Sequence, residues 1–173
     1  LVGLKLAHMA NSTNEDRFVY MSGNGPLLKV LRASLARGYS KEENCTLSKA
    51  KRYSETLLHS VHSFIEEGRR SDQPPFENVV IFDEAQRAWD ESKMKKMDAR
   101  QRKYNASNDL DHPDGTVQSE PLALLEIMGR SGGGAVIVAL CGNSQEIHDG
   151  EAGISEWVRA WQGTSDWEIV SSP

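Results

Sequence analysis

One segment, residues 79–86, constrains the fold of this chain more than any other, and it reads Val-Val-Ile-Phe-Asp-Glu-Ala-Gln. Four apolar residues in a row are typical of a strand buried on both faces, as in a parallel sheet covered by helices on each side. Asp83 and Glu84 then follow at the carboxyl end of the strand, where open α/β sheets place their ligands. Adjacent carboxylates are costly to bury without a cation or a reaction that needs them. The segment therefore predicts Mg²⁺ and phosphate chemistry at this edge.

The rest of the chain alternates between strand-like and helix-like stretches, which favours βαβ units around a parallel sheet. Apolar runs predict further strands at residues 18–21, 135–141 and 167–170, and the run at 135–141 is apolar enough for a second central strand. Apolar stripes at helical spacing predict helices at 1–10, 26–37, about 57–65, 119–128 and 153–161.

Breaker and polar residues predict where these elements end. Gly38 is expected to end the helix that starts at Pro26, and Ser119 is expected to cap a later one. Residues 39–51 are polar and predict irregular structure. Residues from about 90 to 118 are also highly polar and rich in turn formers, which predicts a partly disordered insertion.

Bulk properties limit the class of protein. A chain of 173 residues suits one globular domain with a core. The mean hydropathy is −0.54, and no run approaches the roughly 20 apolar residues of a membrane span, so we expect a soluble, cytoplasmic protein without a membrane partner. The two cysteines, Cys45 and Cys141, imply neither a disulfide framework nor a zinc site.

The charge is unevenly distributed along the chain. The net charge is −5 and the pI about 5.6, which argues mildly against a dedicated nucleic-acid-binding module. Residues 87–103 are the exception, with seven basic residues against three acidic ones and a net charge of +4. Such a segment is able to meet a phosphate backbone, but a solvated helix face or loop explains it more simply.

Polar residues follow two other predicted strands. Right-handed crossovers would bring the strand ends to one edge of the sheet and place Gln145 beside the acid pair. Its side-chain amide would there contact a γ-phosphate, or it would simply cap a turn. The turn at residues 22–26, Ser-Gly-Asn-Gly-Pro, offers backbone amides at a helix start. This turn lacks the Lys-Ser or Lys-Thr pair of a nucleotide phosphate loop, and no other part of the sequence contains such a loop. A contact to a nucleic-acid backbone and a simple strand–helix turn both remain open.

Taken together, these blocks resemble a known family. An apolar strand followed by Asp83-Glu84 is the Walker B signature of nucleotide hydrolases, and Asp-Glu-Ala-Gln is the form usual in helicases. The chain resembles the schlafen-group-3-like DNA/RNA helicase domain of bacterial superfamily-1-type proteins, which are P-loop NTPases. The resemblance covers nearly the whole chain and rests on residues 19–27, 80–89, 119–121, 141–147 and 150–157.

The resemblance implies a three-layer α/β fold, a RecA-like parallel sheet flanked by helices, in a motor that hydrolyses ATP with Mg²⁺ and moves on DNA or RNA. It also implies roles for single residues. Asp83 would bind Mg²⁺, Glu84 would activate water, and Gln145 would sense the γ-phosphate. Gln86 would contact the nucleotide and couple it to the rest of the motor. The nucleic-acid strand would be contacted by Ser22, Gly23, Asn24, Gly25 and Pro26.

Residues 1–4 resemble what directly follows the Gly-Lys-Thr loop in this family, so the chain is expected to lack the first strand and the phosphate loop. Without those parts and a second motor domain we expect it to be inactive alone, since loss of an arginine finger by itself lowers the rate about 10³–10⁵-fold. A sheet edge exposed in this way would favour self-association. Two alternatives remain: a non-motor nucleoside triphosphatase that acts as a regulatory switch, and a non-catalytic binding module.

Overall fold

A sheet of four parallel strands forms the centre of the molecule. The computed structural model describes residues 17–113, 115–142 and 153–171 of the chain. The strands lie in the order β2-β1-β3-β4, with β1 at Phe18–Ser22, β2 at Leu58–Ser60, β3 at Val79–Asp83 and β4 at Val136–Leu140. β1 and β3 pair in register along their full length. The predicted α/β fold with a parallel sheet is confirmed.

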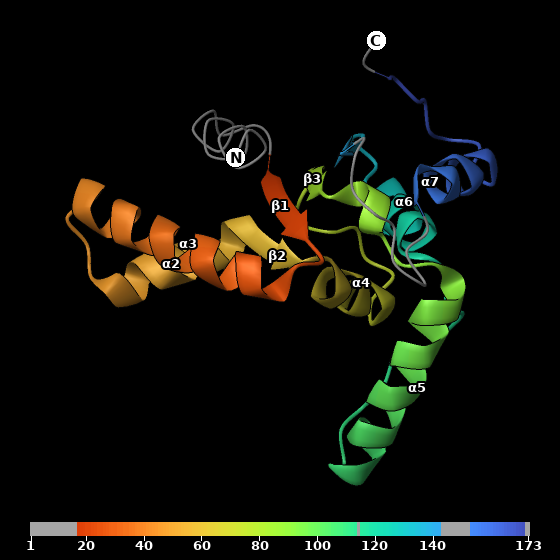
Figure 1. Cartoon of the computed structure of the whole chain (residues 1–173), viewed down its shortest axis with the longest axis horizontal. Helices are drawn as coiled ribbons and strands as arrows, with labels where there is room; N and C mark the ends of the chain where they lie inside the picture. Colours follow the sequence, from red (N-terminus) through yellow and green to blue (C-terminus); the bar gives the residue numbers. More distant parts are fainter. Residues whose placement is uncertain (1–16, 114, 143–152, 172–173) are drawn as a thin grey trace.

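Helices cover both faces of this sheet, which gives three layers (Figure 1). The helices α2 (Gly25–Glu42) and α3 (Leu47–Leu57) cover one face. The other face is covered by α4 (Val61–Arg69), α6 (Glu120–Gly129) and α7 (Gly153–Gln162). Because side chains alternate along a strand, β3 contributes to both cores. This arrangement is consistent with a RecA-like fold. Among the described residues, no helix is both long and apolar enough to cross a membrane.

Local sequence explains where α2 and α3 begin. Asn24 caps α2 by accepting a hydrogen bond from the Leu27 N–H, and Pro26 occupies the first turn, where its missing N–H is not needed. Thr46 caps α3 in the same way. The Ser119 side chain, by contrast, makes no capping hydrogen bond to α6, so that prediction is wrong in its detail.

Two predicted boundaries between α2 and α4 are wrong. The helix α2 continues through Gly38 to Glu42, and α3 starts at Leu47, so the predicted irregular stretch at 39–51 is mostly helical. Tyr39 and Tyr53 stack at 3.9 Å between ring centroids and hold α2 against α3. The predicted helix at 57–65 is in fact the end of α3, the short strand β2 and the start of α4. Buried residues at both ends of β2 continue the helical spacing and conceal the strand.

Two predicted strands also differ from the structure. Residues 167–170 are not a strand, because the Trp167 indole donates to the Leu125 carbonyl oxygen at 3.2 Å and holds this segment against α6. β4 forms as predicted but lies at the edge of the sheet, where β3 is its one strand partner within the described residues. Its Val136 is 52% exposed. The predicted helix at 1–10 lies outside the described residues.

The polar segment after β3 is largely helical. A short 3₁₀ turn, η1 (Ala85–Arg87), leads to α5 (Glu91–Ser107), so much of the polar stretch at 90–118 is helical. That this stretch is partly disordered stays a prediction. Asp90 caps α5 by accepting from the Lys93 N–H at 2.7 Å. The helix projects away from the sheet (Figure 1). Whether this segment is an insertion relative to the family stays a prediction.

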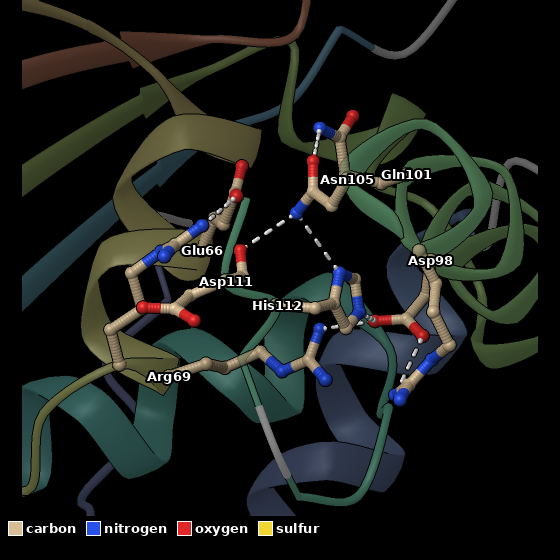
Figure 2. A network of polar contacts seen from close by, with 9 residues as sticks. Glu66, Arg69, Asp98, Gln101, Asn105, Asp111 and His112 are labelled. Carbon is tan, nitrogen blue, oxygen red and sulfur yellow. Dashed lines mark hydrogen bonds and ion pairs between the residues drawn. The ribbon is translucent and has the colours of Figure 1, made fainter. Parts of the chain in front are cut away.

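A partly buried carboxylate anchors α5 to the body of the protein. Asp98 accepts a hydrogen bond from the Arg69 guanidinium of α4 at 2.7 Å and lies 3.1 Å from Nε2 of His112 (Figure 2). Asn105 in turn contacts His112 and donates to the Asp111 carbonyl oxygen, which folds the following loop back onto the helix. Burial by itself would raise the pKa of Asp98. The hydrogen bonds and charges of Arg69 and His112 outweigh this effect and hold the pKa below its usual range.

We predict that Asp98→Asn lowers the free energy of unfolding by about 2 kcal/mol, the usual range for a hydrogen bond to a charged group. Because the folded-state pKa of Asp98 is depressed, this contribution is present above the unfolded-state value of about 3.9 and is lost as pH falls through the folded-state pKa. Urea denaturation at neutral and acidic pH measures both effects. The control is Glu91→Gln, which removes an exposed ion pair with Lys95 and should change stability by less than about 1 kcal/mol. Equal losses in the two variants would contradict the anchoring role.

Candidate functional site

The pairing of β1 with β3 places the carboxyl ends of both strands side by side, with Ser22 opposite Asp83. The turn after β1 and Glu84, the residue directly after β3, therefore border the same cavity, of about 330 Å³. Gly23, Asn24, Gly25, Pro26 and Glu84 all line it. Two motifs that lie sixty residues apart in the sequence thus come together at one site. The remaining lining residues are Phe82, Arg87, Trp89, Lys93 and Glu120.

The turn after β1 is held by its own side chains. Ser22 is fully buried, and its hydroxyl oxygen accepts a hydrogen bond from the Asn24 N–H at 3.1 Å. Asn24 is itself occupied in capping α2. Among the residues predicted to contact nucleic acid, Ser22 is therefore placed to shape the turn, whereas residues 23–26 face the cavity.

The two acidic residues face different surroundings. Asp83 accepts hydrogen bonds from the Tyr20 hydroxyl of β1 and from the Glu84 N–H. Glu84 lines the cavity, and its backbone is left-handed, with a φ of 55°. A non-glycine residue in that conformation costs roughly 1–2 kcal/mol and is more frequent at functional sites than elsewhere. The two carboxylates that the sequence places next to each other thus differ in surroundings: Asp83 bonds to Tyr20, and Glu84 lines the cavity.

Tyr20 keeps its proton and thereby serves as a donor to Asp83. Burial and the hydrogen bond to the Asp83 carboxylate raise the pKa of the phenol well above its ordinary value. Tyr20 is 2% exposed and lies among the residues packed under α2 and α3. No pattern in the sequence indicates this contact, because the two residues lie on different strands and meet only when the sheet forms.

Gln86 links the end of β3 to the end of β4. It is 4% exposed, and its Oε1 accepts a hydrogen bond from the Gly142 N–H at 3.1 Å. The indole of Trp157 in α7 also donates to the Ala85 carbonyl oxygen at 2.8 Å. The first contact joins η1 to the segment that follows β4, and the second joins η1 to α7. Gln145 itself lies outside the described residues, so its position opposite the acid pair stays a prediction.

Sequence reasoning missed a buried carboxylate beneath the cavity. Glu120 is 1% exposed and forms two hydrogen bonds with Trp89: the Trp89 N–H donates to Oε2 at 2.9 Å, and the Glu120 N–H donates to the Trp89 carbonyl oxygen at 3.0 Å. Nδ1 of His62 lies 2.6 Å from Oε1, in ion-pair range, although the two atoms are not aligned as a hydrogen bond. The His62 ring also stacks on the Trp89 ring at 3.9 Å. Glu120 thus fixes the chain between η1 and α5.

Two cations also line the cavity, Arg87 and Lys93. Nη1 of Arg87 is 3.6 Å from Oε2 of Glu84, and Nζ of Lys93 lies 4.7 Å from the centre of the Trp89 ring. The basic character of residues 87–103 indicated that this segment could contact phosphate. It did not show which of its residues would lie near the acid pair. The cavity therefore combines backbone amides, cations, an aromatic ring and the two carboxylates of Glu84 and Glu120. This mixture is able to accommodate a phosphate group together with a nucleobase.

The oxygen donors at this edge suit Mg²⁺. This ion is usually bound through one or two carboxylates plus phosphate oxygens. Asp83 supplies such a carboxylate, and no cluster of three or more His, Cys, Asp or Glu side chains gathers anywhere in the described part of the chain. A metal here would therefore depend on phosphate ligands as well as on Asp83.

Comparison with known protein families gives one match. The family described as Schlafen group 3, DNA/RNA helicase domain, matches residues 1–172. No curated protein and no solved structure matches the chain. The resemblance inferred from the motifs is thereby confirmed.

We predict that Tyr20→Phe makes the protein less sensitive to alkaline pH. The pKa of Tyr20 is raised in the folded state, so its contribution to stability is present below the unfolded-state pKa of about 10 and is lost as pH rises above it. The wild-type protein should therefore lose more stability than Tyr20→Phe between about pH 9 and 11. Urea denaturation measures this, and Tyr104→Phe, at an exposed position, is the control. If the stability of the Tyr20→Phe variant falls as steeply with pH as that of the wild-type protein, the hydrogen bond to Asp83 does not raise the pKa of Tyr20.

Proposed function

Because this chain belongs to the schlafen group 3 DNA/RNA helicase domain family, we propose that it is part of an ATP-dependent DNA/RNA helicase or translocase. The family implies interaction with nucleic acid and nucleotide in general. Our proposal goes further: Mg²⁺-dependent ATP hydrolysis at this sheet edge drives movement along a nucleic-acid strand. The observation that carries it is the single cavity shared by Glu84 and the turn at residues 23–26.

We assign a separate task to each carboxylate. Asp83, held by Tyr20, would bind Mg²⁺, which would neutralise charge on the transferred phosphate. Glu84 would accept a proton from the attacking water. Glu84 also borders the turn at residues 23–26, so a nucleic-acid strand bound there would lie within reach of the residue that activates water. This proximity supports coupling between strand binding and hydrolysis.

Gln86 would transmit the state of the nucleotide. Its hydrogen bond to Gly142 links the acid-bearing strand to the segment that precedes Gln145, which we propose as the γ-phosphate sensor. A side chain that is buried and bonded in this way moves only when both strand ends move. A shift at the acid pair would therefore reach the end of β4 without further contacts.

The missing phosphate-binding loop has a natural place in this fold. β4 is apolar throughout its length, yet it pairs on one side alone within the described residues. A further parallel strand added there would place its carboxyl end beside Gly142, with the end of β4 between it and Asp83. We propose that the phosphate loop of the full-length protein follows such a strand. On this basis the chain is inactive by itself, and its open edge favours self-association.

A cytoplasmic location and a bacterial source stay predictions.

We predict that Glu84→Gln in the full-length protein lowers ATP turnover by at least about 100-fold, the usual contribution of a general base. Binding of Mg²⁺-ATP should persist, because the proposed phosphate and metal contacts do not involve Glu84. Steady-state phosphate release and nucleotide binding are the two measurements. The matched control is Glu55→Gln, on the exposed side of α3, which should leave turnover unchanged.

The same assay separates the proposal from its rivals. Nucleic acid should stimulate turnover by a motor, whereas a regulatory switch should show no stimulation. A full-length protein that binds no Mg²⁺-ATP would instead be a non-catalytic binding module. Turnover by residues 1–173 alone, abolished by Glu84→Gln, would contradict the proposal that this chain needs a phosphate loop from elsewhere.

A further inference from the structure

Helix α5 carries more positive charge than its own acidic residues neutralise. It contains six basic and two acidic residues, in a chain whose net charge is −5. It projects from the body of the protein (Figure 1), so most of its surface faces solvent. Its two faces differ in how the charges are paired.

One face of α5 is neutralised and attached to the body. Met94 and Asn105 are its buried residues, and Asp98 on the same side pairs with Arg69. Next to them, Glu91 pairs with Lys95, and Asp98 also lies 3.7 Å from Arg102. Both acidic residues of the helix are therefore used on this side.

The opposite face carries four cations in a row. Lys93, Lys96, Arg100 and Lys103 follow one another at spacings of three, four and three residues, which places them on one side of a helix with about 3.6 residues per turn. We call these four residues the basic stripe. Lys96, Arg100 and Lys103 are exposed, and none of them has an ion pair with a described residue. The exposed aromatic ring of Tyr104 lies beside the stripe.

The basic stripe begins at the candidate functional site. Lys93 lines the cavity together with Gly25, Pro26 and Glu84. Asp90 caps α5, and Glu120 holds the adjacent Trp89 in place, so the orientation of the helix is set where it leaves the cavity. The hydrogen bond between Asp98 and Arg69 fixes the helix again further along. The stripe is thus a firmly attached extension of the cavity.

We propose that the basic stripe binds the phosphate backbone of the nucleic acid that occupies the cavity, and guides the strand along α5 as it leaves the turn at residues 23–26. This inference rests on the proposed function, because it takes nucleic acid as the ligand of the cavity. The dimensions agree: the stripe runs over eleven residues, from Lys93 to Lys103, and covers about 15 Å of helix. One strand of a duplex presents about four phosphates over that length. The contact depends on charge and carries no preference for base sequence.

The test compares two variants with equal loss of charge. One replaces three residues of the basic stripe, as Lys96→Gln, Arg100→Gln and Lys103→Gln. The other replaces three exposed cations of α2 and α3, as Lys41→Gln, Lys49→Gln and Arg52→Gln. Residues 1–173 are mixed with labelled single-stranded DNA, single-stranded RNA and duplex DNA of about 20 nucleotides, and fluorescence anisotropy is followed from about 50 to 200 mM salt.

For single strands, we expect the stripe variant to lower the slope of log K against log salt by about 2, because each lost phosphate contact removes about 0.7. Its affinity at about 0.1 M salt should fall on the order of 100-fold. The α2–α3 variant should keep the wild-type slope. A third variant, with Lys96→Arg, Arg100→Lys and Lys103→Arg, retains the charge and should also keep it. Circular dichroism confirms that α5 remains folded in all of them.

The other outcomes overturn the inference. If the stripe variant and the α2–α3 variant have equal slopes, the contact does not lie on α5, and the proposed function stands. If the stripe variant keeps its oligonucleotide binding but no longer binds polyglutamate, the stripe serves an acidic protein partner. If the wild-type chain binds no oligonucleotide, the inference fails, while the ATP turnover assay on the full-length protein decides the proposed function independently.

Discussion

The parallel pairing of β1 with β3 is the constraint on which the rest of the site depends. It sets Ser22 opposite Asp83, and so brings the turn after one strand next to the acid pair after the other. It also lets the Tyr20 hydroxyl reach Asp83 across the two strands. A slip by one residue would turn the side chains of β3 to the opposite faces of the sheet and break both relations. The in-register contact is protected because both strands are buried between helix layers.

The chain that leaves β3 turns this local geometry into a larger arrangement. Glu84 takes a left-handed conformation and lines the cavity. Gln86 then bonds to the end of β4, and Trp89 bonds to Glu120 at the start of α6. Each contact fixes the segment at a different point of the protein. As a result, α5 leaves the cavity in a defined direction although few of its own residues are buried.

The elements that sequence reasoning predicted well have strong local signals. The run at 79–82 is apolar at every position, and the turn at residues 22–26 contains both a cap and a proline. The failures occurred where the local signal was weak or ambiguous. The pattern around Leu58 continues from α3 into α4, so a three-residue strand within it could not be seen. Residues 91–107 have a polar composition, but capping by Asp90 and the anchoring of Asp98 make them helical.

The sequence by itself determined the class of fold and the position of the acid pair in it, because hydrophobic pattern and turn chemistry act over a few neighbouring residues. Motif resemblance also indicated the family that the comparison confirmed. Only the tertiary structure decided which side chains surround the acid pair. Tyr20, Trp89 and Glu120 come from elements far apart in the chain, and within the described residues β4 pairs with β3 alone. Such contacts depend on how strands order themselves and how helices pack over them, and no local pattern of residues encodes that choice.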